Sequence, residues 1–226
     1  GKHPLMNWKL GPDTGIIGQG DFETFDDFWK AFKEQCEFLC EQSIIGNNQL
    51  GEIYQQHQPA PLISSMTEGC IESGRGVTRG GARYNSSGVS VIGMADVVDS
   101  LMAIKTLVYD EKKITFAELK EAIDSNFAHH PRLHAMIKTR VPRFGSGNEE
   151  SVTMANRVTS LVHDYFASHQ NYRGGPHATG WWSMANHTVY GRVTGCLLYT
   201  SDAADDLLCV DLGGRRSIKK KKNKKK

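Results

Sequence analysis

Residues 68–101 read EGCIESGRGVTRGGARYNSSGVSVIGMADVVDSL, and the rest of the chain is organised around this stretch. It holds seven of the 23 glycines. Gly80 and Gly81 permit a close backbone approach that a Cβ atom would prevent. From Ala95 onward, apolar residues recur at the three- and four-residue spacing of a helix. The stretch therefore predicts, in order, a helix end, a glycine-rich turn, a strand-like piece and a new helix.

Amphipathic helices are predicted on both sides of this stretch. Thr24 is a good N-cap for a long helix that tolerates Gly46 and Gly51 and stops before Pro59. Its apolar stripe comprises Phe25, Phe28, Trp29, Phe32, Cys36, Leu39 and Cys40. A capping box predicts a helix after Thr115.

Two more helices and an extended segment complete the expected fold. The helices are predicted over residues 131–140 and 148–169, and the second carries an apolar face that includes Val152 and Phe166. Residues 177–190 are predicted to be extended, with Trp181 and Trp182 on opposite faces.

Several runs resemble one known family. GGARYNSSG at residues 80–88 and the long run IGMADVVDSLMAIKTLVYDEKKITFAEL at residues 92–119 are similar to the pyruvate formate-lyase family of glycyl radical enzymes. NYRGG at residues 171–175 and TGWWSMANH at residues 179–187 extend the resemblance more weakly. The resemblance covers residues 1–195. It implies an α/β fold, in which this mostly helical chain is a C-terminal-half slice of a ten-stranded barrel, incomplete at both ends.

The resemblance also implies a chemistry. A separate S-adenosylmethionine-dependent, 4Fe-4S activating enzyme would install a glycyl radical in the full-length parent. That radical would pass to a cysteine, whose thiyl removes a hydrogen atom from a small-molecule substrate. No bound cofactor is expected in this chain, and the parent is expected to be a cytoplasmic homodimer, or one housed in a bacterial microcompartment.

Within the family, YNSSG and TGWWSM look closer to eliminating lyases of the choline trimethylamine-lyase or isethionate sulfite-lyase type. Formate C-acetyltransferase and the glycerol or diol dehydratase type stay open as alternatives. An alternative of another class is a non-catalytic helical protein whose basic tail binds phosphates.

Two segments imitate the family's catalytic motifs. Gly69-Cys70-Ile71-Glu72 matches the motif of the thiyl cysteine and its neighbouring acid, and Arg192-Val193-Thr194-Gly195 matches that of the radical glycine. The resemblance places both true motifs elsewhere in the parent. Cys70 is therefore expected to be a buried helical residue, and Cys70, Glu72 and Gly195 are not assigned catalytic roles. The fragment alone is expected to be inactive.

A substrate-pocket wall is the remaining candidate site. It combines aromatic faces with hydroxyl and amide groups, a mixture that suits a dry cavity. We assign to it Tyr84, Asn85, Thr179, Trp181 and Ser183, with Trp182 beside them. The alternative for each residue is ordinary packing of a strand against a core.

No metal site is expected. Cys36 and Cys40 lack a third cysteine at cluster spacing and are interpreted as small apolar residues of a packed stripe. His134 shares a helix face with His130, but no acidic partner is evident, so a solvated helix start is the interpretation for the histidines at 129, 130 and 134.

The charge is divided unevenly along the chain. The formal net charge is +2, but residues 196–226 carry nine basic and four acidic side chains, so residues 1–195 are net −3. The tail opens with CLLYTSDAAD, which resembles a translated sequencing adapter, and its lysines match a translated poly-A run. We expect residues 1–195 to be a partial domain and the tail to be an artefact. Neither a nucleic-acid partner nor a membrane span is expected.

Overall fold

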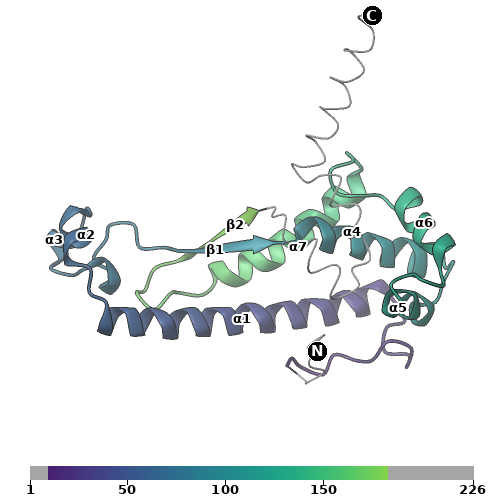
Figure 1. Ribbon diagram of the computed structural model, residues 1–226, viewed down its shortest axis with the longest axis horizontal. Helices are drawn as coiled ribbons and strands as arrows, with labels where there is room; N and C mark the ends of the chain where they lie inside the picture. Colours follow the sequence, from purple (N-terminus) through teal and green to yellow (C-terminus); the bar gives the residue numbers. More distant parts are fainter. Residues whose placement is uncertain (1–9, 183–226) are drawn as a thin grey trace, which may run out of the picture.

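The computed structural model describes residues 10–182, which form an elongated, mostly helical arrangement (Figure 1). Helix α1 (Phe25–His57) runs along the long axis, with α2 (Pro61–Met66) and α3 (Cys70–Ser73) beyond its C-terminal end. The strands β1 (Ser87–Ile92) and β2 (His177–Trp182) lie in a second layer with α4 (Met94–Ile104) and α7 (Glu149–Ala167). The other elements are η1 (Val77–Arg79), the π-helix η2 (Lys105–Asp110), α5 (Phe116–Asp124) and α6 (Pro131–Arg140).

The start and end of α1 follow the local signals in the sequence. The Asp27 amide donates to Thr24 Oγ1 at 3.2 Å, and the Thr24 amide donates to Asp27 Oδ2 at 2.9 Å, which makes a capping box. The Thr24 hydroxyl also donates to Asp27 Oδ2 at 2.6 Å, and this bond, together with the one from the Thr24 amide, stabilises the carboxylate and lowers the pKa of Asp27. The helix ends at His57, two residues before Pro59, as predicted.

The main core lies between the first half of α1 and the helices α4 to α7. Met102, Leu107, Leu119 and Ile137 are fully buried there, and the aromatic rings of α1 pack around them. The prediction was wrong for Leu39 and Val152, whose side chains are 58% and 45% exposed. Both lie on a helix face that no described element covers.

The last turn of the helix predicted from Ala95 has an unexpected form. Regular helix stops at Ile104, and Lys105–Asp110 continues as a π-helix, which is wider than an α-helix. Within this wider turn, Leu107 is fully buried, while Val108 is only partly buried. The capping box at Thr115 and helix α6 are confirmed.

The two strands pair in parallel, so that Ser87 lies opposite His177 and Ile92 opposite Trp182. One face of this two-stranded sheet packs on α1 and α7, where Val89, Val91 and Trp181 contact a cluster that contains Cys40, Ile44, Val162 and Phe166. The other face, which we call the open face, is not covered by any element among residues 10–182. It consists of Gly88, Ser90, Ile92, Ala178, Gly180 and Trp182.

Candidate functional site

Two glycine-rich turns that are almost 90 residues apart in the sequence meet at the start of the sheet. Asn85 Nδ2 donates to the Arg173 carbonyl at 2.9 Å, and Arg173 Nε donates to Asn85 Oδ1 at 2.6 Å. Arg173 Nη2 also donates to the Ser86 carbonyl at 3.1 Å. This reciprocal pairing, which we call the polar junction, holds the first residues of β1 against the turn that leads into β2.

Glycines make the polar junction possible. A Cβ atom on Gly175 would lie 1.4 Å from the Asn85 carbonyl oxygen, so no other residue fits there without moving the backbone. Within the turn, the buried Asn171 accepts the Gly175 amide at 3.0 Å. The Tyr172 amide donates to Asn48 Oδ1 at 2.9 Å and ties the turn to α1. The close approach predicted at Gly81 is also confirmed, because its Cβ would lie 1.7 Å from the Arg75 carbonyl oxygen.

A hollow of about 350 Å³ opens beside the polar junction. Tyr84, Asn85, Tyr172 and Arg173 line it, together with Thr78. The Arg173 guanidinium lies over the Tyr172 ring at 4.8 Å, whereas the Tyr84 side chain is 82% exposed. The structure therefore brings Tyr84 and Asn85 of the predicted wall together at one hollow.

The other predicted wall residues lie elsewhere. Thr179 Oγ1 is 2.9 Å from Nδ1 of His163 on α7, and Trp181 packs in the cluster between α1 and α7. Both therefore point toward the helices and not toward the open face. Ser183 lies outside the described residues. The assignment of Thr179, Trp181 and Ser183 to a pocket wall stays a prediction.

Apart from Trp182, the residues on the open face of the sheet were not among those that the sequence analysis placed in or beside the pocket wall. Its residues are mostly small, and Trp182, which is 64% exposed, is the large aromatic among them. The Trp182 indole lies close over Gly180, where a Cβ atom would come within 2.8 Å of the indole nitrogen. The alternation of small residues with Val89 and Val91 along β1 marks two faces, but which face the helices cover depends on tertiary packing.

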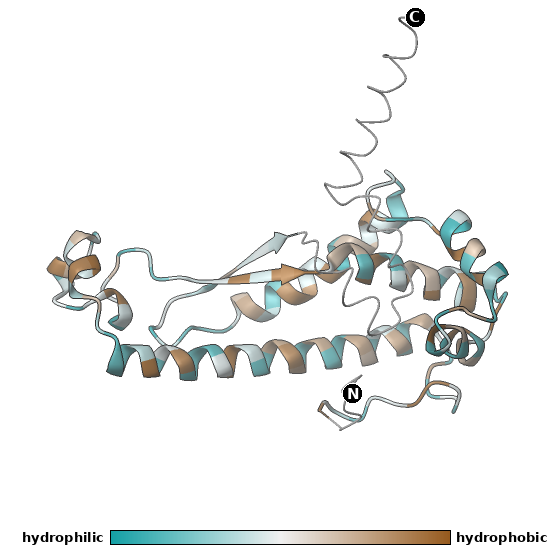
Figure 2. Ribbon diagram, viewed as in Figure 1, coloured by the Kyte–Doolittle hydropathy of each residue, from teal (hydrophilic) through white to brown (hydrophobic). Residues whose placement is uncertain are grey.

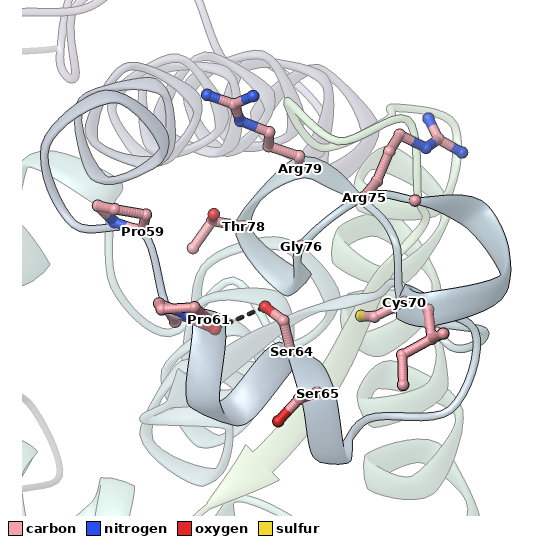
Figure 3. Close-up of a pocket in the computed structure, with 12 residues that line it drawn as sticks. Pro59, Pro61, Ser64, Ser65, Cys70, Arg75, Gly76, Thr78 and Arg79 are labelled. Atoms are coloured by element: carbon pink, nitrogen blue, oxygen red, sulfur yellow. Dashed lines mark hydrogen bonds between the residues drawn. The ribbon is translucent and has the colours of Figure 1, made fainter.

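A second hollow, of about 530 Å³, lies between α2, α3 and η1 (Figure 3). Cys70 is 4% exposed, and Figure 3 shows its sulfur pointing toward this hollow. The Glu72 carboxylate caps α3 by accepting the Gly69 amide at 3.0 Å. The side chain of Glu72 is thus engaged in a structural hydrogen bond, while Arg75 and Arg79 lie at the rim.

The cysteines and the histidine considered as metal ligands are packed against other side chains. Burial raises the pKa of the Cys40 thiol to about 11 and also raises the pKa of Cys36, so both thiols are protonated at neutral pH. The His134 ring stacks on the Phe127 ring with 4.8 Å between the ring centroids, and burial lowers the pKa of His134. Within residues 10–182, no three His, Cys, Asp or Glu side chains gather as a metal site.

Besides Ser183 and the predicted extended segment beyond residue 182, two more expectations lie outside the described residues. They concern Gly195 with its Arg-Val-Thr-Gly motif, and the basic tail at residues 196–226. Among the described helices, none combines the length and the apolar character needed to cross a membrane.

Comparisons with known proteins all place this chain in the same family. The family model described as "Pyruvate formate lyase-like" matches residues 1–191. Trans-4-hydroxy-L-proline dehydratase of Clostridioides difficile is 27% identical over 86% of this chain and 24% of its own length. (2S)-3-sulfopropanediol dehydratase of Klebsiella oxytoca is 29% identical over 82% of this chain and 22% of its own. The chain thus spans about a quarter of the length of these relatives.

Solved structures give the same result for the fold. Hydroxyproline dehydratase of Clostridioides difficile superposes with a TM-score of 0.80 and 26% identity, covering 87% of this chain and 26% of that one. The B12-independent glycerol dehydratase of Clostridium butyricum gives a TM-score of 0.76 and 30% identity, covering 84% and 24%. The arrangement of helices around a parallel strand pair is therefore that of a slice from these larger proteins.

Proposed function

The chain belongs to the pyruvate formate lyase-like family, and from this premise we propose that it is part of a glycyl radical enzyme that eliminates water or another small leaving group from a hydroxylated substrate. The two relatives and the two solved structures described above are all dehydratases. Isethionate sulfite-lyases are also similar, at 26% identity over 82% of this chain for the Oleidesulfovibrio alaskensis protein. The reactions of these relatives are therefore eliminations and not acetyl transfers.

The observation that carries this proposal is the open face of the β1–β2 sheet. The side chains at Gly88, Ser90 and Ala178 are small and project little from the sheet, and the Trp182 indole, which lies over Gly180, adds one aromatic surface. A shape-selective pocket needs apolar walls with a few placed polar groups, and this face supplies that mixture. We assign it to the wall of the substrate cavity, with Tyr84 and Asn85 at the neighbouring hollow.

The role of the described residues in such an enzyme is positioning and exclusion of water. The polar junction fixes the start of both strands, and the helices behind the sheet hold it rigid. A rigid dry wall keeps a bound substrate oriented and protects reactive intermediates from side reactions. In this proposal the thiyl cysteine and the radical glycine belong to other parts of the longer protein, and Cys70, Glu72 and Gly195 do not supply them.

The partners follow from the same proposal. A radical S-adenosylmethionine activating enzyme would install the radical, and the longer protein would act as a homodimer. The reaction would take place in an oxygen-poor cytoplasm or in a bacterial microcompartment.

The test begins with the longer gene, recovered by amplification outward from the codons for residues 68–101. Its product would be activated without oxygen and examined by electron paramagnetic resonance for a glycyl radical. It would then be offered trans-4-hydroxy-L-proline, 2,3-dihydroxypropane-1-sulfonate, glycerol and isethionate. We expect a radical signal and elimination from at least one of them. A product that forms no radical would refute the proposal.

A matched pair of variants tests the wall. Ser90→Leu places a large side chain on the open face and should raise KM about tenfold or more with an unchanged radical yield. Thr179→Val alters the covered face and should leave KM within about twofold. The reverse ranking would show that the cavity lies on the other face.

A further inference from the structure

The hollow between α2, α3 and η1 has a positively charged rim. Arg75 and Arg79 both line it, and both side chains are exposed. Within residues 10–182, neither guanidinium group forms an ion pair or a hydrogen bond. Figure 3 shows both side chains at the rim, and no other side chain drawn there reaches either guanidinium group.

Neighbouring acids do not balance this charge. Glu68 forms an ion pair with Arg83, and the Glu72 carboxylate caps α3. In the described part of the chain, no aspartate or glutamate lines the hollow. Since residues 1–195 carry a net charge of −3, this rim is a local positive site on an acidic body. A concave site lined by one sign of charge attracts ligands of the opposite sign.

The inside of the hollow combines hydroxyl groups with apolar surface. Ser65 and Thr78 bring the hydroxyl groups, whereas Pro59, Pro61 and the buried Cys70 bring apolar surface. Figure 2 shows hydrophobic and hydrophilic residues close together in the segment that carries α2 and α3. The volume of about 530 Å³ lies within the usual range of small-molecule pockets.

The backbone that carries the two arginines is held in place. The Val77 amide donates to Ser64 Oγ at 3.1 Å. The Arg75 amide donates to the Cys70 carbonyl at 3.2 Å. Binding therefore requires little rearrangement of the backbone, which keeps the cost of ordering low. The exposed arginine side chains change rotamer rapidly and can turn over the opening when a ligand enters.

We propose that this hollow binds a small organic phosphate monoester. The phosphate group accepts hydrogen bonds from Arg75, Arg79 and the Thr78 hydroxyl, while the organic group lies against Pro61 and Cys70. A phosphate monoester carries nearly two negative charges at neutral pH, which match the two unpaired guanidinium groups. A carboxylate or a sulfonate carries one negative charge and matches them less well. This inference does not rest on the proposed enzyme activity.

Isothermal titration calorimetry of the 226-residue chain with phenyl phosphate tests the site. Arg75→Gln and Arg79→Gln should each raise Kd about tenfold or more, because each removes a charge-assisted hydrogen bond. Benzenesulfonate, with its single charge, should bind more weakly than phenyl phosphate by about tenfold. Inorganic phosphate, which lacks the apolar group, should also bind about tenfold more weakly.

Arg83→Gln is the matched control. It removes the same charge from the same turn, but Arg83 does not line the hollow and already pairs with Glu68. Its Kd for phenyl phosphate should stay within about twofold of the wild-type value. Circular dichroism of all three variants checks that the fold is retained, as expected for exposed positions.

Three results would overturn the proposal. Binding that neither Arg75→Gln nor Arg79→Gln weakens would place the anion elsewhere, for example on the basic tail. Equal weakening by Arg83→Gln would show that general surface charge attracts the ligand. The same titration is repeated with the longer protein recovered from the gene. Loss of binding there would show that another part of that protein fills the hollow in place of a free ligand.

Discussion

The helical core around Met102 and the polar junction around Asn85 stabilise two parts of the molecule by different physics. Met102 has no exposed surface and is surrounded by apolar side chains of the helices, so the core depends on volume and shape. The polar junction depends on directional bonds, with the Asn85 amide and the Arg173 guanidinium each oriented by the other. Damage to the core should therefore destabilise the whole fold, whereas damage to the polar junction should loosen only the strands next to it.

The largest expected effect comes from opening the core. Met102→Ala removes a fully buried side chain and should lower the free energy of unfolding by about 3 kcal/mol. Urea denaturation followed by circular dichroism measures this loss. Met66→Ala is the matched control, because Met66 is 73% exposed, and it should change the free energy by less than about 0.5 kcal/mol.

A glycine substitution should break the polar junction while sparing the core. Gly175→Ala forces the Asn85 carbonyl to move and should cost about 2 kcal/mol. Hydrogen exchange should show faster exchange in β1 and β2 with unchanged protection in α4. Gly88→Ala on β1, where nothing lies within 4 Å of the Cβ position, should be tolerated. Equal loss of protection in α4 would mean that the two regions unfold as one unit.

A gentler change tests whether the geometry of the bonds matters. Arg173→Lys keeps the charge but loses the paired donors to Asn85 and Ser86, and should cost about 1 kcal/mol. Arg79→Lys is the control, since Arg79 lies exposed at the rim of the second hollow. Thermal unfolding of both variants measures the difference. Indistinguishable midpoints would show that charge alone holds the polar junction.

The smallest expected effect is a loss of stability at low pH. Hydrogen bonds with Thr24 lower the pKa of Asp27, and those with Thr115 lower the pKa of Glu118, below the ordinary values of these carboxyl groups. A lowered folded-state pKa gives stability above the unfolded-state pKa that is lost as pH falls through the folded-state value. Stability should therefore decline slightly below about pH 5. Replacing both threonines by valine should flatten this decline, and a steeper decline would contradict the assignment.

Local signals in the sequence predicted the helices well. Thr24, Pro59, Thr115 and Pro131 each act on the nearest turn of backbone, so their effect can be read without tertiary information. The π-helical turn at Lys105–Asp110, in which Leu107 is fully buried, carries no such local signal.

The candidate site was harder to predict because it depends on contacts between distant residues. The sequence marked Asn85 and the NYRGG turn separately, but their reciprocal hydrogen bonds link positions 88 residues apart. Alternation along a strand likewise defines two faces without saying which one the helices cover, and Thr179 and Trp181 lie on the covered face.

The register of the sheet has a consequence for the order of folding. Ser87 pairs with His177, so the chain must close a loop of about 90 residues before the first rung of the ladder forms. Helices α4 to α7 lie within that loop and can form from local contacts, which are made faster than distant ones. The helical core should therefore act as the template on which the strand pair assembles late. A ribosome would have to release β2 before the β1 strand acquired its partner.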